Sequence, residues 1–314
     1  MSTSSSRSAL EFDQLTKRFG EHVAVDAMTF SVPRGSIFGF LGPNGAGKTT
    51  TIGMALGLIP PSSGTARVLG FDIRTNPSEV LQNVGAMVER PAFYPYLSGR
   101  MNLQVFGAQA GMDDRSRIEE IIDLVGMSER ANAKFGGYST GMKQRIGIGA
   151  ALLCDPELVI LDEPTNGLDP AGQREIRELV RRLSETGHTV FVSSHILAEI
   201  QEVCSHVAII NRGKLVSTGP MSEILAGTDQ LVIDVDRPED ARQTLLNIPD
   251  LEKVVVDERQ RLIVDVSLDR APEINQTLVQ SGFAVSQLRH QEGQLEERFL
   301  ALTGQATGSE QTNG

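Results

Sequence analysis

The chain has 314 residues, 40% of them hydrophobic and 22% charged, which is typical of a soluble protein with about two domains. The 40 acidic residues outnumber 29 lysines and arginines, and the formal charge of -11 argues against a general nucleic-acid binder, because such proteins need excess cations. No apolar run approaches the roughly 20 residues that cross a bilayer, and the isolated Cys154 and Cys204 argue against a zinc or disulfide framework and favour a reducing cytoplasm.

Short apolar runs alternate with helical patterns from about Ser8 to Leu225. Strands are predicted at 36–41 (SIFGFL), 157–164 (ELVILDEP) and 188–195 (HTVFVSSH), and a helix is predicted at 48–58 (KTTTIGMALGL). Near-continuous apolar runs separated by helices indicate an α/β fold with a mainly parallel sheet. The polar carboxyl ends of its strands would gather at one edge, where ligands of open α/β sheets bind.

The pattern changes after Leu225. Strand-like segments at 230–236, 253–258, 261–268 and 283–289 are separated by helical patterns at 238–248 and 271–282, and a last helix is predicted at 294–302. The order β-α-β-β-α-β predicts a small ferredoxin-like α+β domain over 226–304, after a first domain over 8–225. The polar ends, 1–7 and 305–314, have the composition of disordered tails.

Residues 42–49 (GPNGAGKT) match the phosphate-loop motif G-x-x-x-x-G-K-[ST] between a predicted strand and a predicted helix. Glycines allow backbone N–H groups to curl around phosphate oxygens, and the helix N-terminus adds partial positive charge. In such a loop Lys48 reaches the outer phosphates and Thr49 joins a magnesium shell. A chance glycine turn is the alternative, which the flanking elements disfavour. The candidate nucleotide-binding residues are Gly42, Pro43, Asn44, Gly45, Ala46, Gly47, Lys48, Thr49 and Thr50.

A nucleoside triphosphate is therefore the expected ligand, although a phosphate loop alone does not select a mechanism. Switch GTPases, motor ATPases and transport ATPases all contain this loop. The sequence has no Asn-Lys-x-Asp motif for guanine recognition, which argues against a GTPase.

Two adjacent acids, Asp162 and Glu163, end the predicted strand at 157–164. At such a strand end Asp162 would hold Mg²⁺ through its water shell, and Glu163 would activate the attacking water. The alternative is that both simply begin a turn ahead of Pro164. Ser139 and Gly141 stand at the start of another predicted helix, where a hydroxyl and free N–H groups can bind an anion or merely cap the helix. A second anion site makes sense if two copies of the chain face each other across shared nucleotide.

The ordered set GPNGAGKTT (42–50), YSTGMKQR (138–145), LVILDEP (158–164), GLDP (167–170) and SSH (193–195) resembles the nucleotide-binding subunit of ATP-binding-cassette (ABC) transporters. The resemblance covers about residues 8–225. The pentad 138–142 stands where the family usually has Leu-Ser-Gly-Gly-Gln and departs from it at three positions. GMKQR looks like the exporter branch that serves drugs, antibiotics and peptides.

The resemblance implies a phosphate-loop cassette with a helical subdomain at about 90–150, and an ATPase that uses ATP and Mg²⁺. It also implies a separate integral membrane permease as partner, a second copy of the cassette in an ATP-dependent homodimer, and a place on the cytoplasmic face of the cell membrane. No nucleic-acid partner is expected. For the C-terminal domain we expect a regulatory or dimer-supporting role.

The resemblance also assigns roles to single residues. Phe19 would stack on adenine, Asp169 would line the dimer seam, and His195 would bind the terminal phosphate. Lys48, Glu163 and His195 would form the catalytic set. The alternatives are a core phenylalanine, a turn aspartate before proline and a structural histidine.

Glu89 stands where the family usually carries glutamine, and we expect it to touch Mg²⁺ or the attacking water and to report nucleotide state to the permease. Thr49, Asp162 and Glu89 are thus the expected metal-site residues. A similar glutamate occurs in the subgroup linked to lantibiotic immunity and bacitracin export; the alternative is an alignment shifted by one residue. The proline- and tyrosine-rich stretch 91–96 would form a pocket for a permease helix if exposed, or helical core if buried.

Two other classes of function remain open. A non-transport ABC ATPase would act on nucleic acid or on the ribosome, but such relatives carry long coiled coils or two cassettes in one chain, and this chain has one cassette without long heptad runs. A binding module without catalysis is disfavoured because Lys48, Asp162, Glu163 and His195 are all present.

Overall fold

The computed structural model describes residues 8–89, 91–112, 114–225, 230–249, 251, 253–266, 268–291 and 295–303. The chain divides into two compact units, and the division falls between residues 221 and 222. The predicted disordered tails, 1–7 and 305–314, lie outside the described residues.

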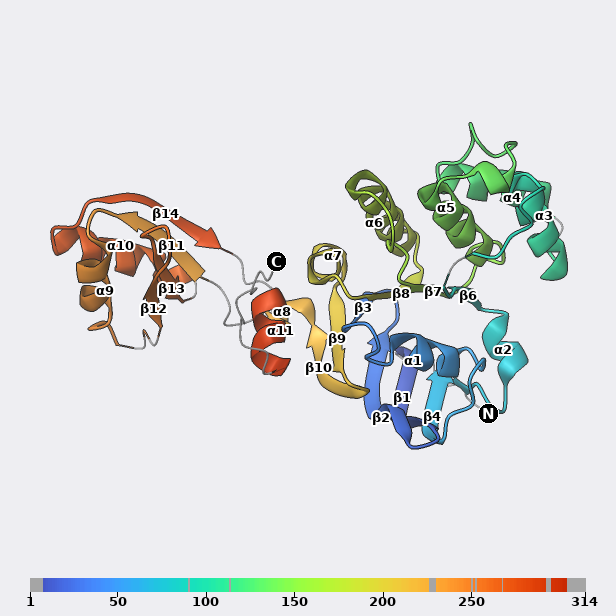
Figure 1. Cartoon of the computed structure of the whole chain (residues 1–314), viewed down its shortest axis with the longest axis horizontal. Coiled ribbons are helices and arrows are strands. Elements are labelled where there is room, and N and C mark those ends of the chain that lie inside the picture. Colours follow the sequence, from blue (N-terminus) through green and yellow to red (C-terminus); the bar gives the residue numbers. More distant parts are fainter. Residues whose placement is uncertain are drawn as a thin grey trace, which may run out of the picture. The chain divides into compact units, whose positions relative to one another are not determined.

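A six-stranded sheet with the order β10-β9-β3-β8-β7-β6 forms the centre of the first unit (Figure 1). Its five strands from β9 to β6 are parallel, and β10 pairs antiparallel with β9. The strands are β3 (Ile37–Leu41), β6 (Val84–Met87), β7 (Leu158–Asp162), β8 (Thr189–Ser194), β9 (His206–Asn211) and β10 (Lys214–Pro220). The strands predicted from the apolar runs are confirmed as β3, β7 and β8, and the sheet is mainly parallel.

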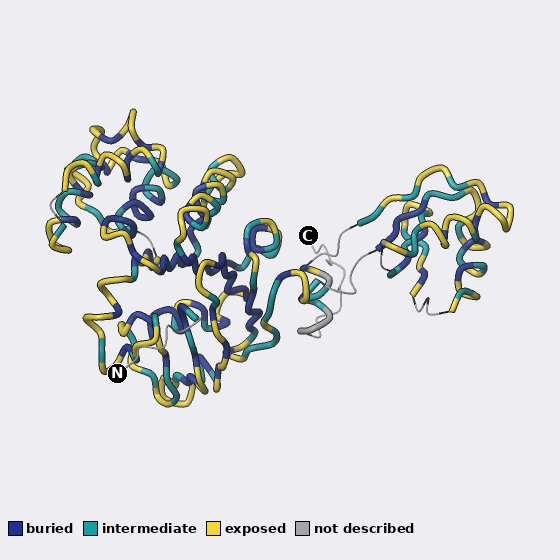
Figure 2. Tube along the Cα trace, turned by 180° about the vertical axis from the view of Figure 1, so that it is seen from behind, coloured by how far each residue is buried: buried dark blue, intermediate teal, exposed yellow. Residues whose placement is uncertain are grey.

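Strands β3, β7 and β8 are buried along their whole length, as the dark tube in Figure 2 shows. Leu41 of β3 pairs with Ser194 of β8, and Asp162 of β7 pairs with Ser193 of β8. The three strands therefore end at the same edge of the sheet, and the polar residues that follow them are brought together there.

A second sheet, β2-β1-β4-β5, packs with the first around helix α1. It consists of β1 (Ser8–Phe19), β2 (His22–Pro33), β4 (Ser63–Val68) and β5 (Phe71–Asp72), and α1 spans Lys48–Ala55. Phe30 of β2 stacks on Phe38 and Phe40 of β3, with ring centroids 5.7 and 5.6 Å apart. The prediction for α1 was three residues too long, because Gly57, with φ of +71°, turns the chain out of the helix.

Helices α3, α4 and α5 form a separate group of the first unit beyond β6 and β7 (Figure 1). Besides α1, the α-helices described in this unit are α2 (Pro77–Leu81), α3 (Gly99–Gln109), α4 (Arg115–Leu124), α5 (Thr140–Ala151), α6 (Pro170–Glu185) and α7 (Leu197–Val203), and α8 (Met221–Ile224) lies at the division between the units. Helix α5 approaches β6 so closely that a Cβ on Gly85 would lie 1.9 Å from the carbonyl oxygen of Ala151. Glycine is therefore required at this crossing.

The second unit contains an antiparallel sheet with the order β12-β13-β11-β14. Its elements are β11 (Gln230–Val235), α9 (Pro238–Leu245), β12 (Val254–Val256), β13 (Leu262–Asp265), α10 (Ala271–Gln280), β14 (Val285–Gln291) and α11 (Leu295–Thr303). Alternate side chains of β11, Leu231 and Ile233, pack with Leu245 of α9 and Leu278 of α10. The unit thus has a hydrophobic core of its own.

Within the described part of the chain, none of the helices has the length and apolar character that a membrane crossing requires.

Candidate nucleotide site

Residues 42–47 form the loop between β3 and α1. Gly45 and Gly47 have φ of +80° and +103°, a left-handed conformation that favours glycine. A Cβ on Gly47 would lie 2.5 Å from the carbonyl oxygen of Ala24 in β2. The loop therefore requires glycine at Gly47, which is a glycine of the motif, and its backbone favours glycine at Gly45 as well.

Helix α1 begins at Lys48 with Gly47 as its N-cap, and no side chain caps its first N–H groups. Uncapped N–H groups and the positive end of the helix dipole together bind anions. Residues 43–45 and Thr49 are exposed. An anion can thus reach this helix start from solvent.

The ammonium group of the buried Lys48 is held by three oxygens. Nζ donates to the carbonyl oxygens of Gly42 at 2.6 Å and Pro43 at 3.3 Å, and it forms an ion pair with Glu163 Oε1 at 3.0 Å. A charge removed from water is costly unless it is paired. The Lys48–Glu163 pair therefore links the phosphate loop directly to the end of β7.

Asp162 connects the phosphate loop to β8. Its Oδ2 accepts a hydrogen bond from Thr49 Oγ1 at 2.8 Å, and its Oδ1 accepts one from Ser193 Oγ. The Ser193 hydroxyl in turn accepts a hydrogen bond from the backbone N–H of Glu163 at 2.9 Å. A hydroxyl beside one carboxylate suits Mg²⁺, which usually binds one or two carboxylates together with substrate phosphates and water.

Glu163 also contacts His195, which follows β8. His195 Nδ1 lies 2.7 Å from Glu163 Oε2, and the two side chains are 34% and 19% exposed. Glu163 has φ of +50°, which is uncommon for a residue with a side chain and occurs mainly where the surroundings impose it. One carboxylate oxygen of Glu163 thus contacts Lys48 and the other contacts His195, at the carboxyl ends of β7 and β8.

The structure therefore brings together Lys48, Thr49, Asp162, Glu163 and His195. Ser193, which joins Asp162 to Glu163, was not predicted as a site residue. The motif SSH contained the signal, but from the sequence only its histidine received a role.

Ser139 and Gly141 lie elsewhere, at the start of α5. Ser139 is the N-cap, and its hydroxyl accepts a hydrogen bond from the N–H of Met142 at 3.3 Å. Among the residues that the structure describes, no hydrogen bond or ion pair joins Ser139 to the phosphate loop. A Cβ on Gly141 would lie 3.7 Å from Leu168, so this helix start is close to the turn that precedes Asp169.

Tyr138, where the family usually has leucine, belongs to the core of the helical group. Its hydroxyl donates to the carbonyl oxygen of Arg130 at 2.6 Å, and its ring lies 5.5 Å from that of Phe135. Burial raises the pKa of this phenol above its usual value. The first position of the pentad thus packs inward.

Three further candidates occupy loops and element ends. Asp169 is the N-cap of α6 and accepts a hydrogen bond from the N–H of Gly172 at 3.0 Å. Phe19, at the end of β1, is 51% exposed, with Lys17 Nζ 4.9 Å from its ring centroid. Glu89 is exposed and follows β6, where Met87 pairs with Leu161 of β7. Glu89 therefore lies at the same sheet edge as Asp162 and Glu163.

The fold and the residues at the carboxyl ends of β3, β7 and β8 define a nucleotide-binding protein with a phosphate loop. Comparisons with known proteins specify its family. A family model described as "ABC transporter" matches residues 25–166. The chain is 38% identical over 301 residues to the uncharacterized ABC transporter ATP-binding protein YhcH of Bacillus subtilis, covering 95% of this chain and 97% of that protein. It is 39% identical over 296 residues to the bacitracin transport ATP-binding protein BcrA of Bacillus licheniformis, covering 93% and 96%.

A solved structure of an ATP-binding subunit of an ABC transporter superposes with a TM-score of 0.62 at 28% identity, covering 69% of this chain and 91% of that one. The chain belongs to the ABC transporter family, as an ATP-binding subunit. The predictions of an ABC cassette fold, of ATP as ligand and of an ABC transporter ATPase are thereby confirmed.

Proposed function

We propose that this chain hydrolyses ATP to drive the export of a drug, an antibiotic or a peptide-like compound through a separate membrane permease. The observation that carries the proposal is the similarity, over nearly the whole chain, to a protein named for bacitracin transport. The chain would then work at the cytoplasmic face of the cell membrane, held there by its permease.

The contacts at the sheet edge support a division of roles. Lys48 would bind the outer phosphates, and Thr49 and Asp162 would hold Mg²⁺, which would neutralise phosphate charge. Glu163 accepts the proton of the attacking water, and His195, 2.7 Å away, orients this carboxylate and binds the terminal phosphate. Ser193 keeps Asp162 and Glu163 in register through its two hydrogen bonds.

We assign adenine stacking to Phe19, because an aromatic ring that is 51% exposed can bind a base with its face. Glu89 is assigned to the metal and water side of the site, because it follows β6 beside the acids of β7. An additional carboxylate near a triphosphate adds negative charge, so Glu89 would act through bound Mg²⁺ or water.

The site would be completed by a second copy of the chain. Ser139 and Gly141 begin a helix that does not reach the phosphate loop of its own chain, yet a helix start of this kind binds anions. In a head-to-tail homodimer this helix start would close over the partner's nucleotide, and Asp169 would line the seam. Hydrolysis would then open the seam and move the permease.

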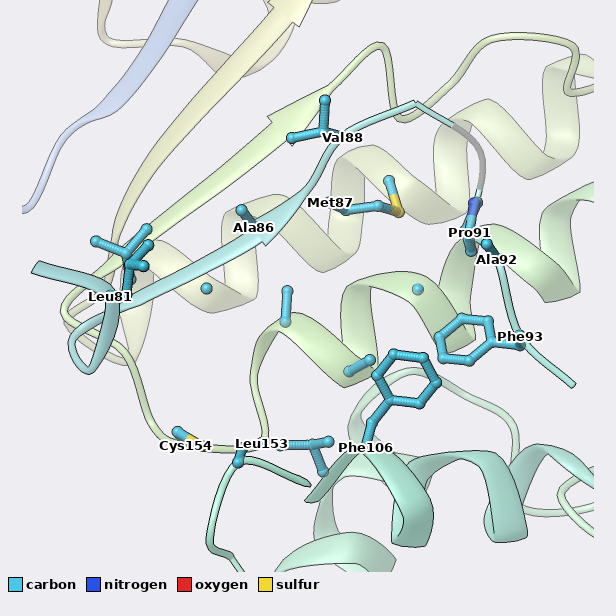
Figure 3. A pocket seen from close by; sticks show the side chains of 16 residues that line it. Leu81, Ala86, Met87, Val88, Pro91, Ala92, Phe93, Phe106, Leu153 and Cys154 are labelled. Atoms are coloured by element: carbon cyan, nitrogen blue, oxygen red, sulfur yellow. The ribbon is translucent and has the colours of Figure 1, made fainter. Parts of the chain in front are cut away.

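A pocket of about 450 Å³, lined by residues with apolar side chains, supports a docking place for the permease. It lies between β6, α3 and α5 and is lined by residues that include Met87, Pro91, Phe93, Phe106 and Cys154 (Figure 3). Phe93 packs inward between the rings of Phe106 and Phe135, at 4.7 and 5.0 Å. The stretch 91–96 is thus partly core and partly exposed, because Tyr94 and Tyr96 are 39% and 66% exposed.

The two cysteines give a test of this docking place. In the free native chain, a thiol reagent is expected to label the exposed Cys154 but not Cys204, because burial raises the pKa of the Cys204 thiol to about 12 and the thiolate is the reactive form. Labelling at pH 8 should therefore give one modified thiol per chain, and two in denaturant.

Binding of the permease should slow the labelling of Cys154, since this residue lines the pocket. A Cys154→Ser chain, which should not label in the native state, is the control. An equal labelling rate with and without permease would count against docking at this pocket.

For the second unit we propose a ferredoxin-like domain over 226–304 after the cassette over 8–225, with the helical subdomain at about 90–150. The elements of the second unit follow the order β-α-β-β-α-β, and its sheet order β12-β13-β11-β14 is the antiparallel arrangement expected for a ferredoxin-like fold. It contributes none of the side chains proposed for catalysis. We infer a regulatory or dimer-supporting role.

Export is tested in cells. Deletion of the gene is expected to increase sensitivity to at least one compound in a panel of peptide antibiotics and drugs. The wild-type gene should restore resistance, whereas a Glu163→Gln gene should not. Unchanged sensitivity over the whole panel would speak against an exporter of this class.

A further inference from the structure

Glu199, in the first turn of α7, is a buried carboxylate that takes no part in the roles proposed above. It is 8% exposed. Its Oε2 accepts hydrogen bonds from Thr165 Oγ1 at 2.7 Å and from Ser194 Oγ at 3.1 Å. Its Oε1 is buried without a hydrogen-bond partner among the described residues. Glu199 lines a cavity of about 20 Å³, enough for about one water molecule.

A carboxylate at this position is costly for the fold. Burying an ionised group is unfavourable unless a cation compensates it, and within the described ranges Glu199 forms no ion pair. Arg177 lines the same cavity, but its guanidinium pairs with Glu202 at 3.0 Å. An apolar side chain would fill the space at lower cost, so the two accepted hydrogen bonds are the distinctive feature of Glu199.

Both donors stand beside the proposed catalytic pair. Thr165 lies two residues after Glu163, in a turn in which the N–H of Asn166 donates a hydrogen bond to the carbonyl oxygen of Glu163 at 3.1 Å. Ser194 directly precedes His195, and its carbonyl oxygen accepts a hydrogen bond from the N–H of Gly42 at 3.3 Å. One oxygen atom of Glu199 therefore joins the two segments that hold Glu163 and His195.

We propose that Glu199 is a positioning residue that fixes the contact between Glu163 and His195 by binding Thr165 and Ser194 with one oxygen. This inference rests on the proposed roles of Glu163 and His195. Glu199 does not reach the nucleotide itself and acts through these neighbours. A displacement of about 1 Å in such a constellation can lower the rate on the order of a hundredfold.

The test is the ATPase activity of the full-length chain over a range of MgATP concentrations. Glu199→Ala should lower kcat about 10- to 100-fold and leave KM within about threefold, because the phosphate loop is unchanged. Glu199→Gln should recover most of the lost kcat, because its amide oxygen accepts the same two hydrogen bonds. Glu202→Ala is the matched control, because Glu202 lies on the same helix with 47% of its side chain exposed, and its ion pairs among the described residues are with Arg177 and Arg181. Its kcat should stay within about twofold of the wild type.

A His195→Ala background separates positioning from general damage. If Glu199 acts through the Glu163–His195 contact, Glu199→Ala should lower kcat little further once His195 is absent, since residues that act as a unit are not additive. If Glu199→Ala instead causes a general structural defect, the double variant should lose kcat by the product of the two single losses. Three results would each overturn the proposal. They are a kcat of the double variant reduced by the full product of the single losses, equal losses of kcat in Glu199→Ala and Glu202→Ala, and a kcat of Glu199→Gln that stays as low as that of Glu199→Ala.

Thr165→Val and Ser194→Ala carry the test if Glu199→Ala does not fold, because each removes one donor and keeps the carboxylate. Each should lower kcat without changing KM, and an unchanged kcat in both would overturn the proposal. Glu163→Gln and His195→Ala are measured alongside. If those two keep wild-type kcat, the proposed function fails; if they lose it and Glu199→Ala does not, only the positioning role fails.

Discussion

Glu163→Gln is expected to lower the ATPase kcat by at least about a hundredfold while the Kd for ATP stays within a few fold, because a general base typically contributes 10²- to 10⁴-fold. The amide keeps the size of the side chain and its place beside Lys48 and His195, but it does not accept a proton from water. The measurement is phosphate release at saturating MgATP, together with the Kd of a fluorescent ATP analogue.

Glu157→Gln is the matched control for this variant. Glu157 directly precedes the first residue of β7, at the end of the strand away from Glu163, and pairs with Arg34 at the surface. Its loss should leave kcat within about twofold, because exposed ion pairs contribute little. A Glu163→Gln chain that hydrolyses ATP at more than a tenth of the wild-type rate would remove Glu163 from the role of base.

Lys48→Ala is expected to weaken ATP binding by about 30-fold to several thousandfold, since truncating one partner of a buried charge pair costs about 2–5 kcal/mol. The variant removes the cation nearest the phosphate loop and leaves Glu163 without its 3.0 Å partner. Both changes raise the negative potential where the phosphates would bind. The Kd for ATP, measured by titration with the fluorescent analogue, gives the size of the effect.

Lys214→Ala serves as the control for lost positive charge. Lys214 is an exposed lysine whose ion pair with Asp26 spans 3.5 Å, and its removal should change the Kd less than twofold. Thermal unfolding of both variants shows whether the fold persists. A folded Lys48→Ala chain that binds ATP within threefold of wild type would contradict the placement of the phosphates.

The elements that position the site could be predicted because their signals are local. A buried parallel strand appears as a continuous apolar run, and the first polar residue after it marks the strand end. This rule placed Asp162 and Glu163 at the carboxyl end of one strand and His195 at the end of another. In the structure Asp162 is the last residue of β7, and Glu163 and His195 directly follow β7 and β8. The phosphate loop was equally clear, because its glycines are required by left-handed backbone and by the close approach of Ala24.

Contacts between distant segments could not be predicted in the same way. Ser193, Thr165 and Glu199 look like ordinary polar residues, and their roles depend on which residues the pairing of β7 with β8 places side by side. The left-handed backbone of Glu163 also has no sequence signal, since glycine is the residue expected there. The exact end of α1 depended on one glycine, Gly57, whose effect the apolar spacing concealed.

In the proposed homodimer, the complete site would need residues that the single chain keeps apart. Glu163 already contacts Lys48 and His195, and Asp162 bonds Thr49 and Ser193, whereas Ser139 caps its own helix. ATP would therefore hold two chains together by binding the phosphate loop of one chain and the start of α5 of the other. Glu163→Gln is the variant in which this state should persist, because nucleotide binds and is not consumed.

The most direct measurement is the mass of Glu163→Gln in solution with and without MgATP, by light scattering over a range of protein concentrations. We expect single chains without nucleotide and dimers with it, and single chains in both conditions for Lys48→Ala. If Glu163→Gln saturated with ATP stays a single chain at every concentration, with or without its permease, the shared site does not exist.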